Sequence, residues 1–174
     1  MNLLAHLLFR LTTNRPTRLI KISGQPYLER YFLCQVLGIT VYLHRFVRDD
    51  KDRALHNHPW RHAISLVLTG GYTEHQGLLM GRTPDGIDTV LTTVKPVKWF
   101  NHIRHSSHHQ IVRVKPETWT LFMHTRWRFE WGFLERLTGP LPHYRYRKHI
   151  PEQPRQWWLT APPAKRANRE PFGG

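Results

Sequence analysis

The sequence predicts an all-β protein that folds as one antiparallel barrel or sandwich. Short segments rich in Ile, Val, Tyr, Phe, Trp and Thr follow one another with a period near two, which is typical of half-buried strands. Gly, Pro and Asp separate these segments at close spacing, and no long helical pattern lies between them. The chain of 174 residues is 40% hydrophobic, which suits a single domain with a sizeable core.

The first expected element is a short helix over residues 2–12, where five leucines recur at helical spacing before Arg15-Pro16 ends the pattern. Strands are then expected at 17–23, 27–36, 39–47, 61–68, 70–76, 87–94, 97–101, 109–115 and 118–124. Gly70-Gly71 and Pro84-Asp85-Gly86 are typical of the turns between them.

From about residue 140 the chain becomes rich in Pro and Arg and loses its period. We therefore expect an N-terminal helix over 1–16, a barrel over 17–139 and a basic extension over 140–174. Tyr and Trp residues are expected to attach the first part of the extension to the barrel. Residues 161–174 are expected to be disordered.

The formal net charge is +14, from 26 Lys and Arg against 12 Asp and Glu. Such a charge attracts polyanions, so a nucleotide or nucleic acid is an expected partner, although a solvated basic surface explains the charge equally well. The single cysteine, Cys34, excludes an internal disulfide and is expected to be buried. The apolar opening is too short to span a bilayer and basic residues follow it, so we expect a cytoplasmic protein without a membrane contact.

The most specific motif is a histidine cluster, Leu55-His56-Asn57-His58-Pro59-Trp60-Arg61-His62. If the segment is a strand, alternation puts His56, His58 and His62 on one face, which Ile64, Leu66 and Leu68 continue. We expect that face to point into the barrel. Buried imidazoles must be hydrogen-bonded or ligated, and neutral imidazole binds Zn, Fe, Ni and Cu. The cluster therefore predicts a metal site.

A second histidine group lies about fifty residues downstream, at 101–110, and leads into a predicted strand. We expect a barrel to bring one imidazole of this group beside the first cluster. His109 is the first choice, and His105 and His108 remain alternatives that the spacing does not separate.

The segments HNHPWRH and ISLVLTGGYTE resemble the first motif of the cupin superfamily, which has two histidines one residue apart, an acidic ligand four positions later and a glycine turn. His56 and His58 match the pair, but His62 stands where the acidic ligand is usual. His109 matches the single histidine of the second motif. The resemblance implies a cupin-type double-stranded β-helix with a divalent ion, Fe, Zn, Ni or Mn, on His56, His58 and His109. His62, Glu74 or water is the fourth ligand.

The pieces YLERYFL, HxHPW, LTGGYTE and WTL…WGF resemble uncharacterised cupin-like proteins of bacteria and phages, over about residues 27–134. For cupins in general, the resemblance implies a metal-dependent enzyme, dioxygenase-like first and isomerase or epimerase second, acting on a small or anionic substrate. The alternatives are a basic module that sequesters a nucleotide or nucleic acid, with a structural metal or none, and a structural phage or host-interaction protein. Whether the barrel forms a homodimer stays open.

Three further residues are candidates for the site. Arg45 is suited to binding a substrate carboxylate or phosphate, Tyr72 to orienting a substrate, and Glu74 to approaching the metal, although a surface carboxylate is the first expectation for Glu74. The sequence has no Gly-rich phosphate loop, no serine nucleophile elbow and no CxxC pair. Covalent catalysis and Rossmann-type cofactor binding are therefore unsupported.

Overall fold

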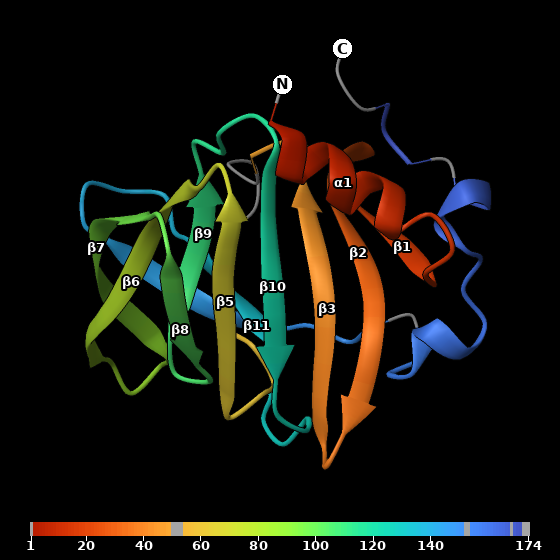
Figure 1. Ribbon diagram of the computed structural model, residues 1–174. Helices are drawn as coiled ribbons and strands as arrows, with labels where there is room; N and C mark the ends of the chain where they lie inside the picture. Colours follow the sequence, from red (N-terminus) through yellow and green to blue (C-terminus); the bar gives the residue numbers. More distant parts are fainter. Residues whose placement is uncertain (1, 50–53, 152–153, 168, 172–174) are drawn as a thin grey trace.

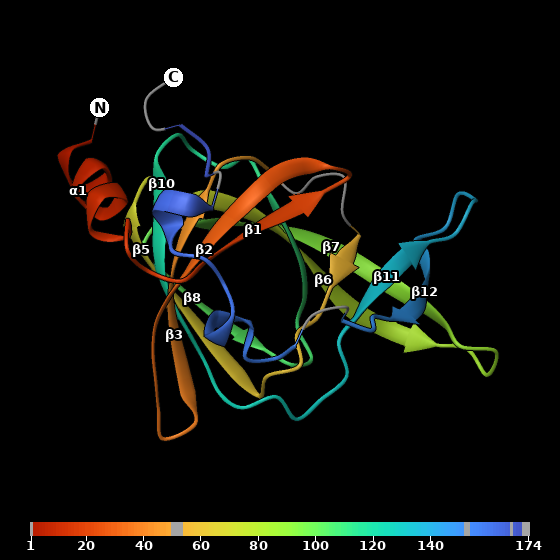
Figure 2. The same ribbon diagram turned by 90° about the vertical axis from the view of Figure 1, so that its right-hand side faces the viewer.

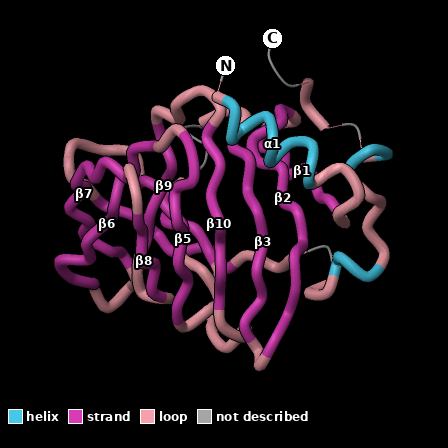
Figure 3. Tube along the Cα trace, viewed as in Figure 1, coloured by secondary structure: helices cyan, strands magenta, loops and turns pink. Residues whose placement is uncertain are grey.

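The structure is a computed structural model that describes residues 2–49, 54–151, 154–167 and 169–171. Strands make up most of it, with a single short α-helix near the N-terminus of the described chain (Figure 3). Every strand pairing is antiparallel. The predicted all-β class, an antiparallel barrel with a short N-terminal helix, is confirmed.

The elements follow the order of the predicted segments closely. They are α1 (Leu3–Leu11), β1 (Thr17–Ile22), β2 (Gln25–Val36), β3 (Ile39–Phe46), β4 (Leu55–His56), β5 (His62–Thr69), β6 (Tyr72–Arg82), β7 (Ile87–Val97), β8 (Phe100–Arg104), β9 (His108–Val112), β10 (Thr118–His124), β11 (Gly132–Arg136), β12 (His143–Lys148) and the 3-10 turns η1 (Trp157–Leu159) and η2 (Ala164–Arg166). The helix begins after Asn2, whose side-chain oxygen caps it by accepting from the backbone N–H groups of Leu4 and Ala5.

The strands form two sheets. The first has the order β1-β2-β3-β10-β5-β8, with β10 between β3 and β5 (Figure 1). The second, β11-β12-β7-β6-β9-β4, closes on itself through the two-residue strand β4. Turned by 90°, the molecule shows the second sheet lying to one side of the first, with α1 on the opposite side (Figure 2). The space between the sheets is therefore the place for an internal site.

The turn between β5 and β6 depends on glycine. Gly70 and Gly71 have backbone φ angles of +73° and +127°, which residues with a side chain rarely adopt. A Cβ on Gly70 would lie 2.8 Å from the Cα of Thr118 on β10, so the turn packs directly on the backbone of the neighbouring strand. This close approach sets where β6 begins, and β6 carries Glu74.

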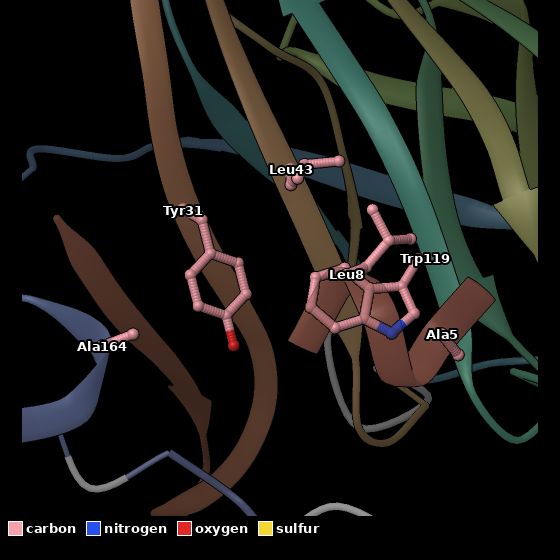
Figure 4. Close-up of a cluster of buried hydrophobic side chains, with 6 residues drawn as sticks. All are labelled: Ala5, Leu8, Tyr31, Leu43, Trp119 and Ala164. Carbon is pink, nitrogen blue, oxygen red and sulfur yellow. The ribbon is translucent and has the colours of Figure 1, made fainter. Parts of the chain in front are cut away.

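Helix α1 covers the outer face of the first sheet. Ala5 and Leu8 of the helix pack against side chains of β2, β3 and β10, and Tyr31 and Trp119 stack with ring centroids 5.5 Å apart (Figure 4). Burial of apolar area here stabilises the helix, which is too short to persist alone in water. Leu43 and Ala164 complete this cluster.

The C-terminal extension is more ordered than predicted. Residues 143–148 form strand β12, which pairs with β11 and with β7 and so belongs to the second sheet. Ala164 is buried in the cluster that contains Tyr31 and Trp119, and Pro163 forms a bridge with Pro16. The expectation of disorder over 161–174 is thus wrong for 161–167 and 169–171, because apolar and hydrogen-bonding partners fix them; residues 168 and 172–174 lie outside the described residues.

The last described residues attach to a buried ion pair. Arg45 lies 3.2 Å from the carboxylate of Glu29, which is completely buried. Arg45 also donates to the carbonyls of Glu170 and Pro171 at 2.7 and 2.8 Å. Arg169 donates to the carbonyl of Phe9 in α1 at 2.8 Å. The extension therefore connects the N-terminal helix to the first sheet.

Two other expectations concern the surface. Cys34 is exposed rather than buried, because β2 has an irregular register between Phe32 and Cys34 and its last residues face solvent. Among the described residues, no helix has the length and apolar character needed to cross a bilayer.

Candidate metal centre

Three imidazoles from two distant segments meet between the sheets. His56 on β4 lies directly opposite His109 on β9 in the strand register, and His58 follows β4. One nitrogen from each ring lies within 4.8 Å of the others, and this is the group of metal-ligating side chains that stands out among the described residues. His56 and His109 are buried, and His58 is half-buried. The two histidine clusters of the sequence therefore converge through a single strand pair.

The local chain explains how both His56 and His58 reach the same point. Strand β4 ends at His56, and the following residues to Pro59 are irregular, so His58 is not constrained by strand alternation. Nδ1 of His56 lies 3.3 Å from the carbonyl oxygen of Ala54, while Nε2 of His58 lies 2.8 Å from Nε2 of His109. When Nδ1 of His56 donates to this carbonyl, its Nε2 keeps a lone pair for an ion.

Glu74 holds His109 from behind. Its Oε1 accepts from Nδ1 of His109 at 2.8 Å and from the amide of Asn101 at 2.6 Å, and its Oε2 accepts from the amide of Gln76 at 3.1 Å. Glu74 is fully buried. The expectation of a surface carboxylate is therefore wrong, because three partners compensate its burial. With Nδ1 of His109 donating to Glu74, Nε2 is the ligating atom, as in carboxylate–histidine–metal arrangements.

The surroundings keep Glu74 ionised. Burial alone would raise the pKa of Glu74, but the interaction with His109, the hydrogen bond from Gln76 and the positive charge of Lys95 outweigh it, so the pKa is lowered. Lys95 donates to the side-chain oxygen of Asn101 at 2.7 Å, which turns the amide of Asn101 toward Glu74. Neither Asn101 nor Gln76 stands out in the sequence as a site residue.

A small cavity of about 60 Å³ adjoins the histidines. Its walls come from both sheets and are mostly aromatic and aliphatic. They include Tyr27, Phe46, Trp60, Tyr72, Phe122, Ile103 and Ile111, with Arg30 and His44 as polar members. The cavity admits only a small molecule or the end of a larger one.

Two further histidines of the first sheet, His44 and the half-buried His124, have pKa values below the ordinary value of histidine. Nε2 of His44 accepts from Nε of Arg30 at 3.0 Å, and burial with this nearby charge holds the pKa of His44 well below its ordinary value. Burial lowers the pKa of His124 to about 4, and its ring stacks on Trp60 with centroids 4.2 Å apart. Sequence reasoning did not single out His44 as a site residue, because strand alternation alone does not say whether His44 or Arg45 points inward.

His62 does not share the face of His56 and His58. Its side chain is exposed, and its Nδ1 lies 3.1 Å from Nε2 of His102. The irregular chain at Pro59 breaks the strand alternation on which the prediction depended, so the parity of β5 is independent of that of β4. The structure therefore does not bring His62 to the three converging histidines.

Arg45 is also placed away from the cavity. On β3, His44 and Phe46 point between the sheets and Arg45 points outward to Glu29, so strand alternation excludes it from the site. His105 and His108, the alternatives to His109, line a different pocket on the outside of the second sheet. Of the three, the structure brings His109 to His56 and His58.

The donor set fits a divalent transition metal. The site has three imidazoles, a buried carboxylate that holds one of them, and an adjoining cavity. Three protein ligands would leave coordination positions for water or substrate. With no acidic residue in the group itself, the three histidines contribute no negative charge to the ion.

Comparisons with known proteins identify similar folds only. No family model matches the chain, and no curated protein matches its sequence. Among solved structures, Fe(II)-HppE with the alternative substrate (S)-1-HPP is 13% identical over 64% of this chain and 55% of its own, with a TM-score of 0.45. KdgF from Halomonas sp. is 13% identical over 64% and 89%, with a TM-score of 0.39. Oxalate oxidase in complex with the substrate analogue glycolate is 21% identical over 52% and 43%, with a TM-score of 0.34.

The chain spans about half the length of the HppE chains it matches. At these identities the reaction of this chain is left undefined. The residues themselves define the site: three histidines that could hold a metal ion, with one nitrogen from each within 4.8 Å of the others, between two antiparallel sheets.

Proposed function

We propose that the protein is a metal-dependent enzyme in which His56, His58 and His109 hold one divalent ion. The observation that carries the proposal is the convergence of three imidazole nitrogens within 4.8 Å at the wall of an internal cavity. Buried imidazoles so close together repel one another when protonated, whereas ligation of one cation uses all three lone pairs. Fe, Zn, Ni and Mn are all compatible with this donor set.

The chain's own residues prepare the site. Glu74 accepts a hydrogen bond from Nδ1 of His109 and thereby fixes the orientation of that ring. The carbonyl oxygen of Ala54 is placed to do the same for His56. Aromatic and aliphatic side chains make most of the cavity wall apolar. Arg30 adds positive charge to that wall, which favours a substrate with a negatively charged group.

The bound ion would supply oxygen activation if it is Fe(II), or polarisation of a carbonyl or phosphoryl oxygen if it is Zn(II), Ni(II) or Mn(II). A dioxygenase-like reaction on a small anionic substrate is the first proposal, and isomerisation or epimerisation is the second. The open positions of a three-histidine set and the small cavity support both.

The test is the metal content of protein purified without a histidine tag, after incubation with each ion and removal of the excess. We expect about one ion per chain, and loss of that ion in His56→Ala and His109→Ala. The matched control is His62→Ala with His102→Ala, a histidine pair that lies outside the site. Absence of stoichiometric metal in the wild type, or equal loss in the control, would overturn the proposal.

Substrate class is tested on the metal-loaded protein. With Fe(II) bound, oxygen consumption in the presence of small carboxylates or phosphonates is expected to fall in Arg30→Gln and to be unchanged in Arg104→Gln, which changes an exposed arginine. Turnover without oxygen consumption on Zn(II), Ni(II) or Mn(II) would favour isomerisation. No turnover of any anionic substrate would leave a metal-binding protein and contradict the enzyme assignment.

A further inference from the structure

A second pocket lies on the outside of the second sheet, and we call it the outer pocket. It has a volume of about 320 Å³, which is within the range of small-molecule sites. Its lining includes Asn57, Arg82, His105, His108, Phe129 and Tyr146. Because strand β9 alternates, His108 faces this pocket while His109 faces the cavity between the sheets. The two sites are therefore back to back across one strand.

Several polar atoms of the outer pocket are buried and make no hydrogen bond of ordinary geometry with a described residue. The side chain of His108 is 7% exposed, and neither of its ring nitrogens makes a hydrogen bond of ordinary geometry with a described residue. The Tyr146 hydroxyl likewise makes no hydrogen bond of ordinary geometry, although the side chain of Asn57 interacts with it. Its ring meets that of His108 edge-on with centroids 6.3 Å apart. Since buried polar atoms are normally paired, these two side chains are suited to a ligand that both donates and accepts.

An aromatic platform stands beside them. His105 and Phe129 stack with centroids 4.0 Å apart and planes 11° from parallel, and Phe129 remains 36% exposed. Nδ1 of His105 is also buried without a partner among the described residues. A flat ring with hydrogen-bonding edges fits such a platform, because stacking tolerates any aromatic face and the edge groups select polar rings.

Positive charge lies at the rim. Arg82 uses Nε and Nη2 to bind both oxygens of Asp88, at 2.7 and 2.9 Å, while its side chain stays 58% exposed. The carboxylate of Asp88 fixes the guanidinium in place at the pocket's edge. A ligand with a phosphate would meet this fixed arginine. The lining also includes the carboxylate of Glu130, which is paired with Lys148, so the phosphate is expected on the Arg82 side of the pocket.

We propose that the outer pocket binds a mononucleotide, with the base on the Phe129 platform against His108 and Tyr146 and the phosphate toward Arg82. This site is separate from the metal centre, because the two pockets share no lining residue. The pocket volume suits one nucleotide rather than a longer strand.

The test titrates the full-length protein with AMP by calorimetry, with adenosine and ribose 5-phosphate as partial ligands. We expect saturable binding of AMP, weaker by about fivefold or more in Tyr146→Phe and by about tenfold in Phe129→Ala. The matched controls are Tyr144→Phe on the same strand and Phe100→Ala, another exposed phenylalanine, and neither should change binding. Both test substitutions are mild or near the surface, so folding is preserved and is checked by circular dichroism.

Three results would overturn the proposal: no saturable binding of AMP, equal effects in test and control variants, or ribose 5-phosphate binding as tightly as AMP. Tighter binding of an oligonucleotide than of AMP would also overturn it, in favour of a nucleic-acid surface. Binding of AMP should weaken with added salt while binding of adenosine should not. Since His56→Ala removes the metal centre but leaves the outer pocket, AMP binding retained in that variant separates the failure of one proposal from that of the other.

Discussion

The two sides of strand β9 show how differently neighbouring histidines are used. His109 points between the sheets, where Glu74 fixes its ring and two more imidazoles lie within reach. His108, one residue earlier, points outward to a pocket where its nitrogens have no ordinary hydrogen bond with a described residue. The difference teaches that a histidine becomes a candidate metal ligand through its second-layer partner and its neighbours in space, and that position in the sequence is not enough.

The largest effect is expected on metal affinity when the carboxylate of Glu74, which binds His109 between the sheets, is removed. Glu74→Gln is expected to weaken metal binding by about ten- to a hundredfold, because an amide no longer accepts strongly from Nδ1 of His109. The dissociation constant is measured by competition with a chelator. The control is Glu130→Gln, which changes an exposed carboxylate at the outer pocket and should leave metal affinity within about twofold. Equal affinities for wild type and Glu74→Gln would remove the basis of the comparison.

A smaller effect is expected on the pH dependence of stability, and it comes from His124, a histidine that is not one of the three candidate ligands. The pKa of His124 is about 4 in the folded protein, against about 6.5 when unfolded. Between these values the unfolded chain binds a proton that the folded chain does not, so the free energy of unfolding falls as the pH falls. We expect His124→Phe, which keeps the stacking on Trp60, to reduce this pH dependence by about 1 kcal/mol per pH unit.

The measurement for this prediction is urea denaturation of the metal-free protein at several pH values between 7 and 4.5. His44 contributes in the same direction, so some pH dependence should remain in the variant. An unchanged slope in His124→Phe would show that His124 is protonated in the folded state.

The smallest effect is expected from substituting His62, which the sequence pattern suggested as a ligand but which the structure leaves exposed. His62→Ala is expected to leave metal stoichiometry unchanged and to alter the free energy of unfolding by no more than about 0.5 kcal/mol, because the side chain is exposed. Elemental analysis and denaturation check both. Loss of the metal in this variant would mean that His62 moves to the centre when the ion binds.

Much of the fold follows from the sequence, because each strand carries its own period and its own turn. The segment predicted at 118–124 is strand β10 over the same residues, and that at 39–47 is β3 at 39–46. Strand β12 was not predicted, since its alternation of Tyr and Arg is hidden in a stretch rich in basic residues and proline. Its pairing with β11 and β7 depends on contacts that no local pattern contains.

The site was predictable where the histidines are close in the sequence and less so where support comes from a distance. His56, His58 and His109 were singled out by spacing and by a resemblance, and the structure brings them together; their ligation of a metal stays a prediction. Glu74 is buried through Asn101 and His109, which lie 27 and 35 residues away. His62 was misplaced because a short irregular segment at Pro59 resets strand parity.

The attachment of the chain's end to its beginning has a practical consequence. Glu29 binds Arg45 and also accepts from the backbone N–H of Glu170 at 2.6 Å, while Arg169 lies over the ring of Phe9. Shortening the protein before residue 169 would leave a carboxylate in the interior with fewer donors and would loosen the first helix at the opposite terminus. A shortened version for crystallisation should therefore keep residues 169–171, because their loss is expected to destabilise helix α1 as well.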